Sequence, residues 1–385
     1  MNHKIETNVS VINSNVNKEN VKSKYFHSIK ESTIRDLKPI LFICRLFGVA
    51  PYTISSTSIS KSQTGVIYSG VIVIYYLCVI SARLKVVYSQ NIDVKLKILT
   101  LARITFLVLT ICADAILCIH WDQKFQNCLE NIWSYEKVFK SDKKGSNLIV
   151  VISWTLSIVT MSFYLFMAIM SYLYDNDRGL VALIDITIFP AITFSILKFL
   201  LFVIVIRKMF RNLNLNLTED SSAGEKVNVK KSNFQELCLL HDQLASAMDD
   251  LNSLYSIPML LWISAITFNI LSRNYQLFII KTIRYFYNDL REILFLIYYI
   301  LILTALTIIC QITAKEANKI SSIMFSPKCY QRHAQNMKND ISNVGYYFHN
   351  YSFKFTAAFG LFAVDLQLLL TIAGAVTTYF VILLH

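Results

Sequence analysis

Seven apolar runs of about 20 residues recur along this 385-residue chain. A run of that length crosses the ~30 Å hydrocarbon core of a bilayer as a helix, because an open strand would leave its backbone groups unpaired in lipid. The chain is 55% hydrophobic and only 16% charged, which argues against a soluble enzyme, a disordered chain and a nucleic-acid-binding domain. We therefore predict an all-α membrane protein with seven transmembrane helices, over residues 64–82, 98–119, 148–174, 182–206, 254–274, 293–312 and 366–384.

The distribution of Lys and Arg predicts how these helices are oriented. With the N-terminus inside, 26 of the 37 Lys and Arg residues lie in the segments on the cytoplasmic side and nine lie outside or at the outer edge. Positively charged loops stay on the cytoplasmic side of a membrane. Seven spans then place the C-terminus outside, which is opposite to the orientation of a G-protein-coupled receptor.

The composition divides the chain into four parts. Residues 1–36 are rich in Asn, Ser and Lys, and we expect a disordered cytoplasmic N-terminus. Residues 37–233 hold spans one to four and end in a flexible cytoplasmic loop. Residues 234–365 hold spans five and six with cytoplasmic helical extensions, and residues 366–385 hold the seventh span.

A heptad pattern leads into the fifth span. Leu237, Leu244 and Leu251 are seven residues apart, and Leu240, Ala247 and Leu254 occupy the alternate positions. One interpretation is a single long helix that packs on its neighbours below the membrane. The other is a helix that joins subunits to one another.

Several residues in the outer halves of the spans are candidates for a ligand pocket. Ionisable residues inside spans are costly and normally pair or face water, and Arg103 and Asp185 lie near the outer surface. Aromatic rings with a few polar groups hold most small ligands, which adds Tyr164, Asn269 and Tyr298. Deeper in the membrane, Asp114 and Lys198 lie at similar depth, so we expect either a salt bridge between them or a lysine that reaches the interface alone.

Three stretches of the chain resemble the insect gustatory receptors, which are relatives of the insect odorant receptors. They are Leu46–Pro51, the run from His241 to Leu251–Ser256, and Thr356–Asp365 followed by Gly374–Tyr379. The family signature is Thr-Tyr, five hydrophobic residues, then Gln-Phe. Here Thr378 and Tyr379 precede five apolar residues, and His385 stands where the family has Gln.

This resemblance implies a ligand-gated cation channel with four subunits around one pore. The last helix of each subunit would line the pore, the other six spans would form a bundle with a ligand pocket, and cytoplasmic helices would anchor the subunits together. Thr378, Ile382 and His385 share one face of the last helix. A ring of Ile382 side chains would close the pore by excluding water, although the same residues could instead pack against neighbouring helices.

The function expected from the resemblance is a gustatory receptor that a small-molecule tastant opens to cations. We expect a homotetramer in the plasma membrane of chemosensory neurons, surrounded by membrane lipids. Related receptor subunits are further candidate partners. An apolar or bitter compound is favoured over a sugar, which would need more carboxylates and amides than we can locate. The alternative is a seven-span metabotropic chemoreceptor that signals through cytoplasmic partners without conducting ions. We find no motif for a metal, a cofactor, a nucleic acid or catalysis.

Overall fold

The structure is a computed structural model that describes residues 35–54, 59–89, 93–120, 122–138, 143–174, 178–219, 234–279, 286–324 and 352–384. Of the N-terminal segment expected to be disordered, residues 1–34 lie outside the described part. Residues 35–46 form a helix, so residues 35 and 36, which were expected to belong to the disordered segment, are helical.

Among the described residues, seven helices are long and apolar enough to cross a membrane, and each overlaps one predicted span. The prediction of a helical protein with seven membrane-spanning helices is confirmed. One span contains a π-helical segment, η1 (Ile184–Ile188), between α6 (Arg178–Leu183) and α7 (Phe189–Glu219). The other six are α2 (Gln63–Ser89), α3 (Val94–His120), α5 (Lys143–Tyr174), α8 (Phe234–Ile279), α9 (Phe286–Met324) and α12 (Leu366–Leu384).

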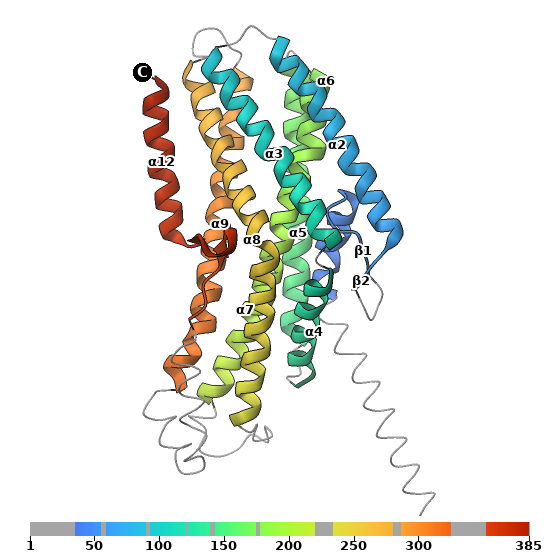
Figure 1. The fold of residues 1–385 in the computed structure, drawn as a ribbon, viewed down its shortest axis with the longest axis vertical. Coiled ribbons are helices and arrows are strands. Elements are labelled where there is room, and N and C mark those ends of the chain that lie inside the picture. The colour runs from blue at the N-terminus through green and yellow to red at the C-terminus, as the bar shows by residue number, and fades with distance from the viewer. Residues whose placement is uncertain are drawn as a thin grey trace, which may run out of the picture.

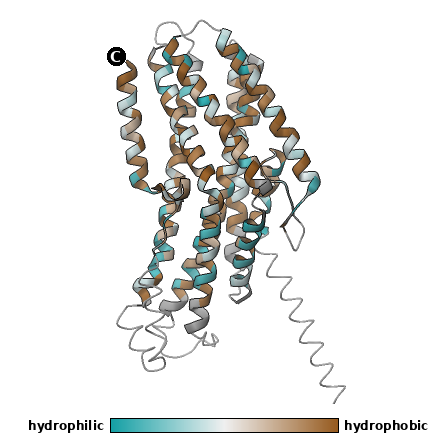
Figure 2. Ribbon diagram, viewed as in Figure 1, coloured by the Kyte–Doolittle hydropathy of each residue, from teal (hydrophilic) through white to brown (hydrophobic). Residues whose placement is uncertain are grey.

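Several helices are longer than a membrane is thick. The 46 residues of α8 would extend roughly 69 Å at 1.5 Å per residue, more than twice the thickness of a hydrocarbon core. Figure 1 shows α7, α8 and α9 continuing past the lower end of α12, and Figure 2 shows that this lower half is more hydrophilic than the upper half. The helix α7 continues to Glu219, past residue 206 where the fourth span was predicted to end. Residues 220–233, the rest of the expected loop, lie outside the described part.

The heptad positions of α8 whose side chains the structure describes are buried within the subunit, and the side chain of Leu237 lies outside the described part. Leu240, Leu244, Ala247, Leu251 and Leu254 are all at most 1% exposed. They face α4 (Asp122–Val138) and α7, where the Cys128 thiol donates to the Ala247 carbonyl at 3.3 Å. Burial raises the pKa of that thiol, so it stays protonated. This arrangement favours the interpretation in which α8 packs on its own neighbours.

Within the described ranges, two short antiparallel strand pairs adjoin the bundle. The first pairs β1 (Tyr52–Ile54) with β2 (Ile59–Lys61) just before α2. The second pairs β3 (Thr356–Ala357) with β4 (Phe362–Ala363) around a short 3-10 turn, η2 (Ala358–Gly360), just before α12. The second pair is therefore the connection that sets where the last span begins.

The turn before α12 is fixed to α8 by side-chain hydrogen bonds. Asn252 donates to the Thr356 hydroxyl at 3.2 Å and accepts from the Thr356 backbone N–H at 2.9 Å. The Asp365 carboxylate then accepts from the Leu368 N–H at 3.0 Å and caps the first turn of α12. Two of the stretches that resemble the receptor family, Leu251–Ser256 and Thr356–Asp365, thus contact each other.

Candidate functional site

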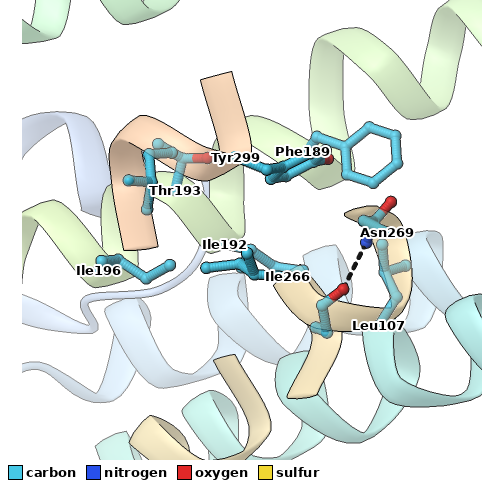
Figure 3. Close-up of a pocket in the computed structure, with 10 residues that line it drawn as sticks. Leu107, Phe189, Ile192, Thr193, Ile196, Ile266, Asn269 and Tyr299 are labelled. Carbon is cyan, nitrogen blue, oxygen red and sulfur yellow. Dashed lines mark hydrogen bonds between the residues drawn. The ribbon is translucent and has the colours of Figure 1, made fainter. Parts of the chain in front are cut away.

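A small cavity lies among α3, α7, α8 and α9 in the membrane-spanning bundle. Its walls are mainly apolar side chains: Leu107, Phe189, Ile192, Ile196, Ile266 and Ile302. Figure 3 shows these side chains meeting from different helices around one space. The cavity measures about 20 Å³, which is room for about one water molecule. A ligand larger than water would therefore have to displace side chains as it enters.

Two polar atoms in the cavity wall have no partner among the described residues. They are the side-chain oxygen of Asn269 on α8 and the hydroxyl of Tyr299 on α9. Asn269 is 3% exposed and Tyr299 is 5% exposed. Buried polar groups are normally hydrogen-bonded, and leaving one unpaired costs about 1–3 kcal/mol. The cavity therefore offers two polar contacts in an otherwise apolar space.

An aromatic layer supports one side of this cavity. Tyr164 on α5 shares a 2.6 Å hydrogen bond with Thr193, a cavity-lining residue of α7. Tyr298 stacks on Phe163 with ring centroids 4.2 Å apart and meets Tyr164 edge-on at 5.4 Å. The sequence candidates Tyr164 and Tyr298 thus contact the cavity wall from behind, and only Asn269 of the five pocket candidates lines the cavity itself.

A buried cluster of charged residues lies beside the aromatic layer. Arg273 on α8 forms an ion pair with Glu292 on α9. Arg291 is 3.5 Å from Glu292 and 4.0 Å from Asp185 of η1, and the Ser171 hydroxyl donates to Asp185. Each of the four charged residues is at most 8% exposed. Removing one partner of such a pair destabilises the fold, because the other charge then stays buried without a counter-charge.

The charged cluster adjoins the cavity through two aromatic rings. The Arg273 guanidinium carbon is 4.0 Å from the Phe295 ring centroid and 5.7 Å from the ring of cavity-lining Tyr299. Arg103, a half-buried residue of α3, is near enough to interact electrostatically with Arg273 and Glu292. The sequence candidates Arg103 and Asp185 therefore belong to this cluster and do not line the cavity. Sequence reasoning missed Arg273, Arg291 and Glu292.

The π-helical segment η1 connects the charged cluster to the cavity. Asp185 lies within η1, and the cavity-lining residues Phe189, Ile192 and Thr193 follow in the next turns of the same span. Single π-helical turns are frequent at functional sites. The segment η1 therefore places Asp185 of the charged cluster and the cavity-lining residues of α7 on one continuous span.

Asp114 and Lys198 lie close together below the cavity level, as their depths suggested. They are near enough to interact electrostatically, but each also has a different hydrogen-bond partner. The Lys198 ammonium donates to the Val49 carbonyl at 2.8 Å, and Asp114 accepts from the Trp262 indole N–H at 3.4 Å. Lys198 therefore ties the Leu46–Pro51 stretch to α7.

The last helix, α12, has no buried residue. One face packs on α3 and α8 through Val376, Phe380 and Leu383, with Phe380 edge-on to Phe278 at 5.8 Å. At 100° per residue, Gln367, Thr371, Gly374 and Thr378 fall on the opposite face, and all four are exposed. A polar stripe thus faces away from the subunit's own bundle.

Two of the three predicted pore residues are visible on α12. Thr378 is exposed, and its hydroxyl donates to the Gly374 carbonyl at 2.9 Å. Ile382 is 61% exposed and flanks the polar stripe. His385 lies outside the described residues. The role of all three in a pore remains a prediction.

Comparisons with known proteins agree with this architecture. The structure of the insect olfactory receptor OR5 from Machilis hrabei in complex with eugenol aligns with a TM-score of 0.69 at 17% identity, covering 90% of this chain and 97% of that one. OR5 without eugenol aligns with a TM-score of 0.67 at the same identity and coverage. A search of curated proteins finds no match. The family described as 7tm Chemosensory receptor matches residues 37–385, so the chain belongs to this family of multi-pass membrane receptors.

Proposed function

We propose that this receptor is a ligand-gated, non-selective cation channel of the gustatory type, opened by a small-molecule tastant. Four copies surround one pore, alone or with related subunits, in the plasma membrane of chemosensory neurons. The bundle of the first six spans holds the ligand in the cavity described above. The last span, α12, lines the pore in each subunit.

The observation that carries this proposal is the exposure of α12. An apolar helix of 19 residues with no buried residue needs lipid or another protein against it. Its stripe of Gln367, Thr371, Gly374 and Thr378 is less apolar than the rest of the helix. The two threonine hydroxyls already donate to backbone carbonyls one turn earlier, and water in a central path would hydrate the Gln367 amide and the remaining acceptor sites of these hydroxyls. Four such helices around an axis would direct their stripes into a central aqueous path, with Ile382 as an apolar constriction.

The relatives support the ligand-gated part of the proposal. One OR5 structure contains eugenol, so a receptor of this fold binds a small molecule. In the present chain, the cavity and α12 share helices, because α8 and α9 line the cavity and also contact α12. Movement of either helix as a ligand enters would shift the helix that lines the pore.

Substitution of Ile382 tests the proposal without an agonist. Ile382→Ser replaces the apolar ring with hydroxyls that hold water, so we expect a standing cation current in excised patches. Ile382→Val keeps the ring apolar and should stay closed. Ile372→Ser is a matched control, because Ile372 packs against the subunit's own core, and it should not produce a current.

The same recordings separate the channel from the metabotropic alternative. A channel conducts in an excised patch without nucleotide or G protein, whereas a metabotropic receptor does not. An epitope tag after His385 that is labelled on intact cells would establish the outward C-terminus that the Lys and Arg distribution predicts. Surface-labelled Ile382→Ser protein that gives no current would contradict the proposal.

A further inference from the structure

The chemistry of the cavity wall limits the class of ligand, and this inference rests on the proposed function because it concerns the same pocket. None of the ten lining residues carries a charge. The polar groups of the wall are the Thr193 hydroxyl, the Asn269 amide and the Tyr299 hydroxyl. Thr193 already shares its hydroxyl with Tyr164. Two polar atoms therefore remain for a ligand among the described residues.

The unpaired atom of Asn269 is a hydrogen-bond acceptor. Its side-chain nitrogen donates to the Ala265 carbonyl one turn earlier in α8, at 2.8 Å, and Figure 3 shows this bond. The nitrogen is thereby turned toward the helix backbone, and the side-chain oxygen is left without a donor. An amide oxygen accepts hydrogen bonds and donates none, so a ligand must present a donor to it.

The unpaired atom of Tyr299 is a hydroxyl that can donate or accept. Its ring is held between two others, with Phe295 stacked at 6.0 Å and Phe189 edge-on at 6.3 Å. Packed rings have few alternative orientations, so the hydroxyl is fixed at the cavity wall. A ligand group that donates a hydrogen bond to the Asn269 oxygen can at the same time accept one from the Tyr299 hydroxyl.

We propose that the cavity binds a compact, neutral, mainly apolar molecule that carries a single hydroxyl group. The ligand hydroxyl donates to the Asn269 side-chain oxygen and accepts from the Tyr299 hydroxyl, while the rest of the molecule contacts the isoleucine and phenylalanine side chains. One hydroxyl satisfies both unpaired atoms at once. A cyclic or aromatic alcohol belongs to this class.

Other ligand classes leave polar groups unpaired. A sugar would bury several hydroxyls against two available atoms, and each unpaired one costs about 1–3 kcal/mol. An ammonium ion would meet no carboxylate in the lining. A ketone or an ester could accept from Tyr299 but would leave Asn269 without a donor. A hydrocarbon would leave both atoms unpaired.

Ligand-observed ¹⁹F NMR on the purified full chain in lipid nanodiscs tests this class without any current. The probes are 4-fluorobenzyl alcohol and 4-fluorotoluene, which differ only in the hydroxyl group, and empty nanodiscs correct for partition into lipid. We expect the wild-type protein to bind the alcohol at least about tenfold more tightly than the toluene. Benzyl alcohol without fluorine should displace 4-fluorobenzyl alcohol from the protein, and sorbitol should not displace it.

Three variants assign the binding to the two atoms. Asn269→Leu keeps the approximate side-chain volume and should weaken alcohol binding about tenfold while leaving toluene binding unchanged or stronger. Tyr299→Phe removes one oxygen and should weaken it several-fold. Ser272→Ala is the matched control, since Ser272 is another fully buried polar residue of α8 outside the cavity lining, and it should bind both probes as the wild type does.

The outcomes separate this inference from the channel proposal. Equal binding of the two probes, no binding of the alcohol, or equal weakening by all three variants would overturn the ligand class. A current opened by sorbitol or by benzylamine would also overturn it, while supporting the channel. Selective alcohol binding that depends on Asn269, in a protein whose Ile382→Ser variant never conducts, would support the ligand class and contradict the channel.

Discussion

The helices α7 and α12 are both apolar enough to cross a membrane, but the subunit buries α7 and leaves α12 exposed. The most apolar part of the span that contains α7 is 94% buried, whereas that of α12 is 0% buried. Figure 1 shows α7 within the bundle and α12 at its edge. The apolar surface of α7 is covered by the chain itself, and that of α12 is left for lipid or other subunits. The difference supports the proposal that α12 works in an assembly.

The largest effect is expected beside α7, the more buried of the two helices. Glu292 faces Arg273 and Arg291 in the buried cluster next to α7. Glu292→Gln removes their shared counter-charge and should lower the free energy of unfolding by about 3–5 kcal/mol. Thermal unfolding of the purified protein measures this loss. The matched control is Asp289→Asn, a half-buried acidic residue in the first turn of the same helix, which should change stability by less than about 0.5 kcal/mol.

A leucine-to-alanine substitution in each helix tests this difference in burial directly. Leu201 of α7 is 1% exposed and Leu370 of α12 is 74% exposed. Leu201→Ala should lower the free energy of unfolding of the subunit by about 3 kcal/mol, because it leaves a cavity. Leu370→Ala should leave the stability of the separate subunit unchanged and reduce the fraction of tetramers seen by mass photometry. Equal losses of stability would show that the exposed face of α12 around Leu370 also packs within its own subunit.

Hydropathy was enough to predict both helices but not how they differ. The length of an apolar run is a local property, so all seven spans could be located from the sequence. Burial depends on which distant segments pack together, and the mean hydropathy of the two runs, 2.4 for the span that contains α7 and 2.0 for α12, does not show it. The heptad positions of α8 show the same limit, because their spacing fits packing within a subunit as well as between subunits.

The candidate site was predictable only where a residue type was unusual for its position. Asn269 stands out as an amide within an apolar run, and it does line the cavity. Arg103 and Asp185 were conspicuous charges, but they belong to a cluster whose other members, Arg273, Arg291 and Glu292, lie at the adjoining ends of the predicted fifth and sixth spans. Arg273 ends one helical run and Glu292 begins the next, and two antiparallel helices bring such positions together. The expected antiparallel arrangement of these two spans could therefore have indicated that Arg273 and Glu292 lie close together.

A smaller effect is expected at the turn before α12, which hydrogen bonds hold against α8. Ala358 and Phe359 have φ values of 52° and 55°, in the left-handed region that costs non-glycine residues about 1–2 kcal/mol. Phe359→Gly should relieve part of this cost and raise the free energy of unfolding by about 1 kcal/mol, since the ring is 68% exposed. Leu361→Gly, at an 81% exposed position with φ of −60°, should instead lower it. A loss of stability in Phe359→Gly would show that the ring itself is needed.

The smallest effect is expected at Gly374, in the middle of the polar stripe of α12. A methyl group added there would meet no described residue within 4 Å apart from the neighbouring backbone of its own helix. Alanine favours a helix over glycine by about 0.8–1 kcal/mol, so Gly374→Ala should slightly raise the stability of the subunit. If the stripe lines the pore, four added methyl groups will lower the single-channel conductance without changing the fraction of tetramers. A reduced fraction of tetramers with unchanged conductance would place Gly374 at a contact between subunits, and the face of α12 directed to the pore would then have to be reassigned.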